Sequence, residues 1–348
     1  MNPRSRLIVR ADGSHAVGAG HLMRCLALTH AWRDRGGAVT FVTYCESDAL
    51  VARLGDASDE LVRLPAPHPS NADRARLLEL AAHHPGATVA LDGYGFDVAY
   101  HRPLRAAGHR LLLLDDHAHQ PRYEADWILN QNTIATPALY AARAPGAALL
   151  LGPAFALLRS EFVRHRGWTR PPLTRVRRIL VTLGGSDPDN VTLTVLRGLA
   201  AAVPADAQVR VIAGHSNAHG DSLRAFASAQ PFDCTILTGV DDMPAELMAA
   251  DVAVSAAGTT TWELAFLQLP ALIVTTADNQ GTNAAAMEQR GATRDLGRPD
   301  AGLAARVARE LRALVADTAA LNAMARAGRT VIDGQGAGRV VDALRALP

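Results

Sequence analysis

The stretch VAVSAAGTTTWELAFLQLPALIVTTADNQ, residues 252–280, predicts the fold of this chain. It begins with a short apolar strand, passes through a turn of small residues at 255–258 and enters a helix predicted over 259–267. A second apolar strand follows at 272–275 and ends at the polar run 278–280. Strand, turn, helix and strand in this order form a βαβ unit, and nearly continuous apolar strands are typical of a parallel sheet buried on both faces.

The same alternation runs through the 348 residues in two series. The first series predicts strands at Leu7–Arg10, Val39–Thr43, Val89–Asp92, Leu111–Asp115, Trp127–Asn130 and Leu149–Gly152, and helices at Gly20–Arg35 and Asn71–Ala82. The second predicts strands at Ile179–Leu183, Val209–Ala213, Thr235–Thr238, Val252–Ser255 and Leu272–Thr275, and helices at Asn190–Ala202, Pro244–Ala249, Thr259–Leu267, Asn283–Arg290 and within Leu303–Leu347. The prediction is an α/β protein with two Rossmann-like domains.

A cluster of Pro and Arg residues separates the two series. It predicts an N-terminal domain over 1–163, a linker over 164–177 and a C-terminal domain over 178–348, with the last helix packing back on the N-terminal domain. The length of the chain suits two hydrophobic cores better than one.

Composition excludes several functions. The net charge is +1, so no overall field favours nucleic acid or an anionic membrane. All 35 basic residues are Arg, and a chain without Lys has neither the amine of a P-loop nor that of a Schiff base. Cys25, Cys45 and Cys234 lack the spacing of a zinc site or a disulfide framework. Without a signal peptide or an apolar run of about 20 residues, we expect a cytoplasmic protein.

Polar motifs follow the predicted strands at their carboxyl ends, where open parallel sheets bind ligands. They are Arg10-Ala11-Asp12, Asp92-Gly93-Tyr94, Asp115-Asp116-His117, Gly184-Gly185-Ser186-Asp187, Ser255-Ala256-Ala257-Gly258 and Asp278-Asn279-Gln280. We expect the two sheets to face a central cleft into which these motifs project. The predicted substrate-binding residues are Gly18, Gly20, Arg24, Gly184, Gly185, Ser186, Ser255, Gly258, Thr259, Thr260, Glu263 and Gln280.

The first long helix opens on Gly18, Gly20 and His21. Two glycines allow close approach of a ligand, and a helix N-terminus favours negative charge. A dinucleotide fingerprint would need Gly where Met23 stands, which disfavours an oxidoreductase. His21 is placed either to point into the cleft or to serve as a capping or surface histidine, and position alone leaves both readings open.

In the second half, the amides of the 184–186 turn and the Ser186 hydroxyl could hold a diphosphate, or form a turn that is purely structural. Thr259 and Thr260 start a helix whose N-terminus can face phosphate. Glu263 lies one turn inside that helix in an otherwise apolar segment, which favours binding of a ribose diol over simple solvation.

Taken together, these motifs resemble the donor-binding domain of GT-B glycosyltransferases of the MurG type. The first half narrows the resemblance through Gly18-Ala19-Gly20-His21-Leu22-Met23-Arg24, Leu151-Gly152-Pro153 and Ala277-Asp278-Asn279-Gln280, which look like the signature of the PseG family, the UDP-sugar hydrolases of the pseudaminic acid pathway. The resemblance implies a GT-B fold and hydrolysis of UDP-2,4-diacetamido-2,4,6-trideoxy-β-L-altropyranose with inversion. It also implies no cofactor and no metal, and pathway enzymes of nonulosonic acid synthesis as candidate partners.

The resemblance also implies roles for individual residues. His21 matches the proposed general base, Tyr94 and Asn279 match other active-site positions, and Glu263 matches the ribose-binding acid. Asp12 either orients His21 or caps a loop. The Asp115, His117 and His119 cluster could ligate a metal, but it lacks a matching ligand set elsewhere. A glycosyltransferase, a hydrolase of another nucleotide-sugar and a non-catalytic nucleotide-sugar binding protein remain as alternatives.

Overall fold

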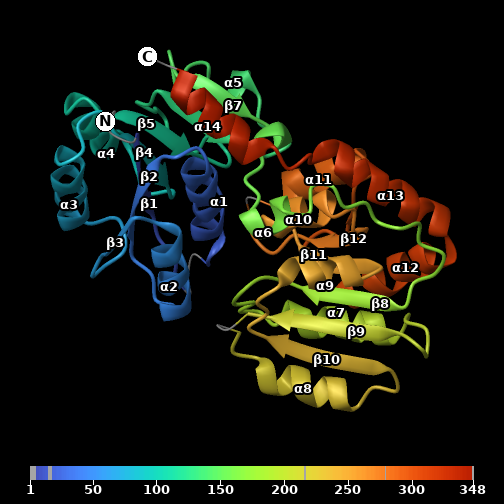
Figure 1. The fold of residues 1–348 in the computed structure, drawn as a ribbon. Coiled ribbons are helices and arrows are strands. Elements are labelled where there is room, and N and C mark those ends of the chain that lie inside the picture. Colours follow the sequence, from blue (N-terminus) through green and yellow to red (C-terminus); the bar gives the residue numbers. More distant parts are fainter. Residues whose placement is uncertain (1–4, 15–17, 215–216, 279, 347–348) are drawn as a thin grey trace. The chain divides into compact units, whose positions relative to one another are not determined.

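The chain forms two compact units in a computed structural model that describes residues 5–14, 18–214, 217–278 and 280–346. The first unit combines Met1–Val163 with Gly334–Pro348, and the second is Arg164–Asp333. Figure 1 shows a twisted sheet covered by helices in each unit. Each unit therefore has a core of its own.

The first unit contains a parallel sheet with strand order β3-β2-β1-β4-β5-β6-β7. Its strands are β1 (Arg6–Ala11), β2 (Ala38–Thr43), β3 (Glu60–Arg63), β4 (Thr88–Asp92), β5 (Arg110–Leu114), β6 (Trp127–Asn130) and β7 (Ala148–Leu151). Its helices are α1 (Gly20–Asp34), α2 (Asp48–Ala57), α3 (Asn71–Ala82), α4 (Val98–Ala106), α5 (Pro137–Tyr140), η1 (Pro153–Phe155), α6 (Ser160–Val163) and α14 (Gly336–Ala346).

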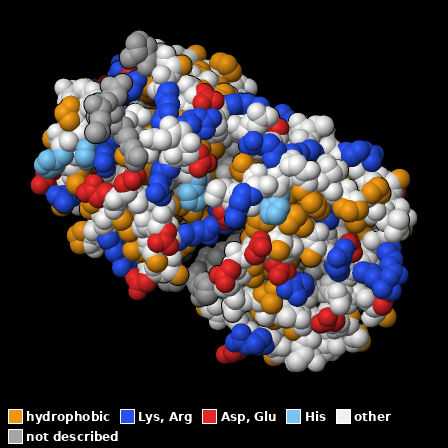
Figure 2. Space-filling view, in the orientation of Figure 1, with side chains coloured by type: hydrophobic (Ala, Val, Ile, Leu, Met, Phe, Trp, Pro, Cys, Tyr) orange, Lys and Arg blue, Asp and Glu red, His pale blue; other side chains and the backbone are white. Residues whose placement is uncertain are grey.

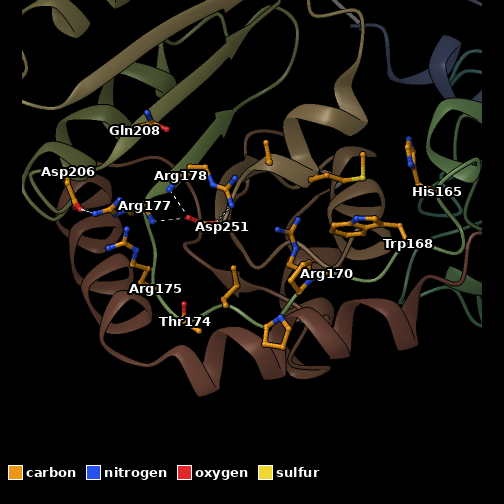
Figure 3. Close-up of a pocket in the computed structure, with 15 residues that line it drawn as sticks. His165, Trp168, Arg170, Thr174, Arg175, Arg177, Arg178, Asp206, Gln208 and Asp251 are labelled. Atoms are coloured by element: carbon orange, nitrogen blue, oxygen red, sulfur yellow. Dashed lines mark hydrogen bonds and ion pairs between the residues drawn. The ribbon is translucent and has the colours of Figure 1, made fainter.

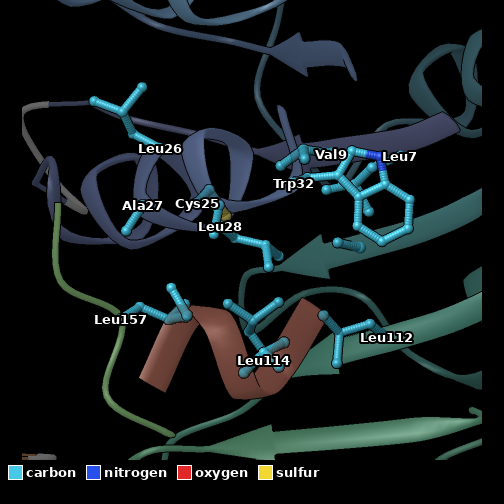
Figure 4. Packing of buried hydrophobic residues seen from close by; sticks show 14 of the residues in the cluster. Leu7, Val9, Cys25, Leu26, Ala27, Leu28, Trp32, Leu112, Leu114 and Leu157 are labelled. Atoms are coloured by element: carbon cyan, nitrogen blue, oxygen red, sulfur yellow. The ribbon is translucent and has the colours of Figure 1, made fainter. Parts of the chain in front are cut away.

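The first sheet is buried on both faces because successive side chains point to opposite sides. Leu7 and Val9 of β1 belong to one apolar cluster, and Ile8 between them belongs to another. Figure 4 shows the first cluster, in which Trp32 of α1 and Leu114 of β5 pack in the same core as the last helix, α14. Each fully buried Leu or Val contributes about 1.5–3 kcal/mol relative to an exposed position.

The second unit contains a parallel sheet with strand order β10-β9-β8-β11-β12-β13. Its strands are β8 (Arg178–Thr182), β9 (Gln208–Ala213), β10 (Asp233–Thr238), β11 (Val252–Ala256), β12 (Ala271–Val274) and β13 (Arg294–Asp295). Its helices are α7 (Val191–Ala200), α8 (Gly220–Ser228), α9 (Met243–Ala249), α10 (Thr260–Phe266), α11 (Gly281–Gln289), α12 (Leu303–Ala316) and α13 (Thr318–Val331).

Both sheets reverse their strand order near the middle, between β1 and β4 in one and between β8 and β11 in the other. In the first sheet β1 pairs with β2 on one side and with β4 on the other, so that Arg10 lies opposite both Val42 and Leu91. The loops that follow two such strands diverge and leave a crevice at the carboxyl edge. The polar motifs predicted to bind ligand follow these strands.

The predicted strands are all confirmed, with ends that shift by one or two residues. The sequence prediction missed β3, whose four residues are partly or fully exposed and lack an apolar run. It also missed β13 and α8, and because it gave only two examples of the helices expected between the first strands, α2, α4, α5 and α6 had no predicted range. The last helix of the chain, α14, lies in the first unit.

The segment 164–177, predicted as a linker, lies within the second unit. Arg170 carries much of its attachment, because its buried guanidinium donates to the backbone carbonyls of Leu247, Ala250 and Leu267. These carbonyls stand at the C-terminal ends of α9 and α10, where backbone acceptors lack helical partners. Burial lowers the pKa of Arg170 to about 10, although Asp251 favours the charged form.

The surface carries interspersed charges. Figure 2 shows basic and acidic side chains mixed over the visible face. No helix in the described ranges combines the length and the apolar character needed to cross a bilayer.

Candidate functional site

His21 is the second residue of α1 and lies directly after the glycine segment that connects β1 to this helix. Gly18 has φ +77°, a left-handed conformation that favours glycine, and it turns the chain into the helix. His21 is 8% exposed. Its Nδ1 lies 2.6 Å from Oδ1 of Asp92, the last residue of β4.

Arg24, one turn further along α1, joins Asp92 to a second carboxylate, that of Asp116. Its Nε and Nη2 donate to the two oxygens of Asp92 at 2.6 and 2.5 Å. Its Nη1 donates to Oδ1 of Asp116 at 2.6 Å. A bidentate contact of this kind fixes both the distance and the plane of the carboxylate. Arg24 was predicted to bind substrate; in the structure its guanidinium is bound by protein carboxylates and is only 6% exposed.

Asp92, Asp116 and Arg24 are all charged at neutral pH. Burial raises the pKa of Asp92, but Arg24 and His21 outweigh it and hold this pKa well below its usual range. The same balance of burial against Arg24 lowers the pKa of Asp116. In turn, burial lowers the pKa of Arg24, but both carboxylates outweigh burial and raise it well above its usual value. Two carboxylates and one guanidinium leave a net negative charge beside the His21 ring.

The charge on Asp92 determines which nitrogen of His21 is basic. An ionised carboxylate only accepts hydrogen bonds, so Nδ1 must carry the proton that it donates to Asp92. Nε2 is then left with its lone pair, and it has no hydrogen-bond partner among the described residues. This is the arrangement in which a carboxylate orients a histidine base and stabilises the imidazolium that it becomes.

Tyr94 follows β4 by two residues and lies against His21. Gly93, with φ +157°, allows the sharp change of direction between them. The Tyr94 hydroxyl donates to Oδ2 of Asp116 at 2.8 Å, and its ring meets the His21 ring edge-on at 5.2 Å. Burial and the charge of Asp116 raise the pKa of Tyr94, so its hydroxyl remains protonated. The structure therefore brings the predicted residues His21 and Tyr94 together.

Asp12 does not orient His21, contrary to one of the two predicted roles. Its carboxylate pairs with Arg10 and accepts from the backbone N–H groups of Tyr44 and His68 at 2.8 and 2.9 Å. Asp12 thus ties down the loops that follow β2 and β3, which is the loop-capping role also considered. Asp92 occupies the orienting position from the end of β4, the strand that pairs with β1.

The Asp115–His119 cluster is divided among separate partners. Asp115 accepts from the Nδ1 of His119 at 3.0 Å and from the hydroxyl of Tyr140 at 2.5 Å, whereas Asp116 belongs to Arg24. His117 is exposed, and its ring contacts Tyr94 at 5.4 Å. Within the described residues, no three side chains of the ligating types are grouped as a metal would require.

The carboxyl edge of the second sheet is built from glycines and hydroxyls. Gly184 has φ +97° and begins the turn that follows β8. Any side chain at Gly214 would collide with the backbone of Gly185, so the loops after β8 and β9 touch through their main chains. Gly184 and Gly185 are exposed and Ser186 is half-buried, which leaves this turn open to a ligand.

The next strand, β11, leads into α10. Gly258, Thr259 and Thr260 are half-buried at this junction, while Glu263 is only 6% exposed. Because α10 has seven residues, its dipole adds little, and any phosphate contact here would come from backbone amides and hydroxyls. Ser255, also predicted to bind substrate, is fully buried in the structure and donates to the carbonyl of Ala256 at 3.3 Å.

The motif after β12 is only partly described. Asn279, a predicted catalytic residue, lies outside the described residues. The side-chain oxygen of Gln280 accepts from the backbone N–H of Thr276 at 2.9 Å, and its amide nitrogen lies 3.8 Å from the position of a Cβ on Gly258. The structure thus brings Gln280 to the β11–α10 junction.

A groove of about 1030 Å³ lies at the opposite, amino-terminal edge of the second sheet (Figure 3). Three of the four arginines that line it have structural partners: Arg178 donates to Asp251 at 2.8 Å, Arg177 pairs with Asp206, and Arg170 binds the helix-end carbonyls. This groove contains none of the predicted site residues, and parallel sheets bind ligands at the other edge.

Comparison with known proteins gives a family match for the second unit. Residues 178–335 match the profile of the glycosyltransferase family 28 C-terminal domain. The chain is 22% identical over 276 residues to the uncharacterized protein MJ1062 of Methanocaldococcus jannaschii, and 27% identical over 205 residues to the spore coat polysaccharide biosynthesis protein SpsG of Bacillus subtilis. These matches cover 77% and 57% of this chain, but only 55% and 56% of the two relatives.

A third relative is the UDP-2,4-diacetamido-2,4,6-trideoxy-β-L-altropyranose hydrolase of Campylobacter jejuni. It is 25% identical over 224 residues, which cover 64% of this chain and 74% of that protein. Among solved structures, MurG of Acinetobacter baumannii superimposes with a TM-score of 0.63 at 16% identity, covering 99% of this chain and all of that one. Anabaena Alr3699/HepE in complex with UDP superimposes with a TM-score of 0.64 at 13% identity, covering 99% and 100%.

These likenesses establish the fold. The chain has a GT-B fold, built from two Rossmann-like parallel-sheet units, as the sequence predicted. Sequence reasoning missed the roles of Asp92 and Asp116, although both stand in motifs that it had singled out. Their position directly after buried strands was the available signal. The order of the strands across the sheet decides the partners of Asp92 and Asp116, and it could not be predicted from the sequence.

Proposed function

We propose that this chain hydrolyses a nucleotide-sugar at its anomeric carbon and releases UDP and the free sugar. The observation that carries the proposal is the 2.6 Å contact between Nδ1 of His21 and Asp92, which leaves Nε2 as a base for water. A water molecule attacks the anomeric carbon on the face opposite the diphosphate. Nε2 accepts a proton from this water, the anomeric C–O bond breaks, and its electron pair leaves with UDP. The product therefore has inverted configuration.

The buried charges of the first unit would favour this step. As His21 gains a proton, the ionised carboxylate of Asp92 stabilises the imidazolium. Tyr94, whose hydroxyl donates to Asp116, presents its ring edge beside His21 and can orient the sugar or the water. We assign the same task to Asn279 from the resemblance. General base catalysis of this kind contributes about 10²- to 10⁴-fold in rate.

The second unit would hold the nucleotide. The exposed turn formed by Gly184 and Gly185, with the Ser186 hydroxyl, suits the diphosphate. Thr259 and Thr260 add donors at the start of α10, and Glu263 suits a ribose diol. HepE has been solved in complex with UDP and with UDP-glucose, which supports the same ligand class here. The proposal assigns no metal to the reaction, and activity that survives dialysis against a chelator would agree with it.

For the sugar, we propose UDP-2,4-diacetamido-2,4,6-trideoxy-β-L-altropyranose. The support is the resemblance of the sequence motifs and the 25% identity to the Campylobacter jejuni hydrolase of this substrate. The enzymes of nonulosonic acid synthesis would then supply this substrate and consume the product. A cytoplasmic location fits such small reactants.

A glycosyltransferase is the second candidate. The match of residues 178–335 to the glycosyltransferase family 28 C-terminal domain favours it, because donor binding is common to both reactions. The two differ in whether water or an acceptor hydroxyl attacks the sugar. A non-catalytic binding protein would retain UDP affinity without turnover.

The decisive experiment is incubation with the proposed UDP-sugar in oxygen-18 water, followed by mass spectrometry of both products. Hydrolysis by the proposed route places the label in the free sugar and none in UDP. Label in UDP would show attack on phosphorus and overturn the proposal. Unchanged substrate, with UDP still binding, would favour a transferase, another sugar or a binding protein.

His21 is tested by His21→Asn, which keeps a polar side chain but removes Nε2. We expect turnover to fall by about 10²- to 10⁴-fold and UDP affinity to stay within a factor of about two. His83→Asn is the matched control, because His83 is exposed on α3 of the same unit and should leave turnover unchanged. An active His21→Asn enzyme would remove His21 from the mechanism.

A further inference from the structure

The turn that carries Tyr94 is held from two sides by histidine rings. His68, from the segment between β3 and α3, has its Nε2 2.9 Å from the carbonyl oxygen of Gly95. His119, from the segment after β5, has its Nε2 2.9 Å from the carbonyl oxygen of Tyr94. These are consecutive carbonyls of one turn, and the rings reach them from separate loops.

Each ring is backed by a buried carboxylate. The Nδ1 of His68 lies 3.0 Å from Oδ2 of Asp73, and the Nδ1 of His119 lies 3.0 Å from Oδ1 of Asp115. Asp73 and Asp115 are 3% and 2% exposed. A carbonyl and a carboxylate both accept hydrogen bonds, so each ring bridges two acceptors.

Each carboxylate also receives a tyrosine hydroxyl. Tyr100 donates to Asp73 at 3.1 Å, and Tyr140 donates to Asp115 at 2.5 Å. The chain therefore repeats one arrangement, tyrosine to aspartate to histidine to backbone carbonyl, on both sides of the Tyr94 turn. Groups that are bonded at both ends hold a single rotamer, which is what an active-site turn requires of its support.

We propose that His68 and His119 are positioning residues that clamp the turn of Tyr94. By fixing the two carbonyls, they hold the Tyr94 ring beside His21. This inference rests on the proposed role of Tyr94 in hydrolysis and adds the residues that keep it in place. Neither histidine touches the reacting atoms in this account.

The two sides of the clamp differ in strength. Gly95 has His68 as the side-chain donor to its carbonyl, whereas the carbonyl of Tyr94 also accepts from Nε2 of Gln120 at 3.0 Å. Loss of His119 is therefore partly covered by Gln120. Substitution of His68 is expected to have the larger effect.

Both ring nitrogens of His68 face hydrogen-bond acceptors. Asp73 is the direct partner of His68. Burial raises the pKa of the Asp73 carboxyl, but His68 and Arg10 outweigh burial and lower this pKa, so the carboxyl is ionised. Arg10 donates to the same carboxylate at 2.8 Å, Asp12 accepts from the backbone N–H of His68, and Tyr100 packs edge-on against its ring. With Nδ1 facing a carboxylate and Nε2 facing a carbonyl, loss of either proton breaks one arm of the clamp.

A pair of substitutions at His68 separates the two arms. In His68→Asn, the amide nitrogen replaces Nδ1 and keeps Asp73, but the contact with Gly95 is lost. In His68→Gln, the longer side chain places its amide nitrogen at Nε2 and keeps Gly95. We expect kcat/KM to fall about 10- to 100-fold in His68→Asn, since a small displacement near the chemistry is costly, and less than about threefold in His68→Gln.

A pH profile distinguishes positioning from a general loss of stability. The hydrogen bond to Asp115 raises the pKa of His119 although burial opposes it, with the rings of Tyr94, His117 and Tyr123 packed around it. As the pH rises through this pKa, the ring loses its second proton and one of its two acceptors, so wild-type kcat/KM should decline on the alkaline side. Glutamine does not titrate. The double variant His68→Gln with His119→Gln should therefore keep activity and lose this alkaline decline, whereas an unchanged decline would contradict the clamp.

Hydrogen exchange tests the clamp without substrate. The peptide that spans 93–97 should exchange faster in His68→Asn than in wild type, and at the wild-type rate in His68→Gln and in the control His83→Asn. Equal exchange in all four proteins would overturn the proposal. Faster exchange with unchanged turnover would show that the turn is clamped but that Tyr94 has no role in the reaction, which also overturns it.

The variants His119→Asn and His119→Gln repeat the comparison from the other side of the turn. A folding defect in His68→Asn therefore does not prevent the test. His119→Asn should lower kcat/KM by less than His68→Asn, because Gln120 still binds the carbonyl. If wild type and His83→Asn are active but His21→Asn is equally active, the proposed hydrolysis by His21 fails instead, and the exchange result on 93–97 still decides the clamp.

Discussion

The two sheets share one strand order, apart from the additional edge strand β7 of the first, and have very different carboxyl edges. In the first unit the edge is a network of buried charges, with Arg24 bound to Asp92 and Asp116 and with His21 against it. In the second unit it consists of exposed glycine amides, hydroxyls and one buried carboxylate, Glu263. One fold thus supports two kinds of chemistry, because the strand ends fix only positions and the residues at them decide the function.

The difference in burial follows from what each edge has to do. A base must keep one orientation, and buried hydrogen-bonded charges provide it, since the low dielectric strengthens each contact. A diphosphate must instead be approached closely by backbone amides, which requires glycine and access from solvent. The first edge should therefore be sensitive to loss of any charged partner, and the second should tolerate single changes.

The largest expected effect is that of Arg24→Met, which removes the one guanidinium that pairs with two buried carboxylates, Asp92 and Asp116. Removing one partner of a buried ion pair costs about 3–5 kcal/mol. We expect the free energy of unfolding of the first unit to fall by this amount, with turnover lost as Asp92 and Asp116 move apart. Urea unfolding followed by hydrogen exchange of peptides from this unit measures the change.

The matched control is Arg105→Met, because Arg105 forms a partly exposed pair with Asp126 in the same unit. Surface pairs contribute about 0–1 kcal/mol, so this variant should differ little from wild type. UDP affinity, which we assign to the second unit, should survive both substitutions. If Arg24→Met were no less stable than Arg105→Met, the contrast between the edges would be lost.

The next largest expected effect is a difference between the two units in how far acid lowers their free energy of unfolding. Burial lowers the pKa of His101, on α4 of the first unit, to about 4 from a usual value of 6.5. A histidine of this kind binds its proton more readily in the unfolded chain, so its stabilising effect is complete above about pH 6.5 and is lost as the pH falls towards 4. Between pH 7 and pH 5 the free energy of unfolding should fall by about 2 kcal/mol from this residue.

The variant His101→Leu should remove this part of the pH dependence while other groups keep theirs. Urea unfolding at pH 7 and pH 5, followed by hydrogen exchange of first-unit peptides, gives the comparison. The described histidines of the second unit, His165 and His219, are both partly exposed, so that unit should respond less to acid over the same range. Parallel pH dependence in His101→Leu and wild type would contradict the assignment.

These contrasts indicate what the sequence could predict. Nearly continuous apolar runs and the glycine turns after them predicted the strands and the carboxyl edges, because a strand buried on both faces is apolar at successive positions. The partner of His21 could not be predicted, since Asp12 and Asp92 both follow buried strands. Only the strand order, in which β4 lies beside β1, selects Asp92, and Asp12 is taken by Arg10 from its own strand.

The burial of polar side chains was the second feature that the sequence could not predict. Arg24 and Ser255 were predicted to bind substrate because polar residues near a glycine turn usually face a ligand. Both are buried, Arg24 against two carboxylates that come from distant parts of the chain and Ser255 inside β11. Local sequence gives no measure of such long-range partners, whereas the glycines that open a turn require only their own backbone.

The smallest effect concerns the second edge. Glu263→Gln keeps the size of the side chain and one acceptor oxygen, but replaces the other oxygen with a donor. If the carboxylate binds both hydroxyls of a ribose, one hydrogen bond to a charged group is lost, and UDP should bind about tenfold more weakly, equivalent to about 1.4 kcal/mol. Calorimetry with UDP and with 2′-deoxy-UDP measures this, because only UDP carries the diol.

The deoxy nucleotide makes the comparison specific. Wild type should prefer UDP over 2′-deoxy-UDP, and Glu263→Gln should lose most of this preference while binding the deoxy nucleotide nearly as well as wild type does. Glu310→Gln is the control, since Glu310 forms a surface pair with Arg309 on α12. Equal weakening for both nucleotides would mean that Glu263 supports the fold of α10 and not the ribose, and the second edge would then be a structural turn with no assigned acid.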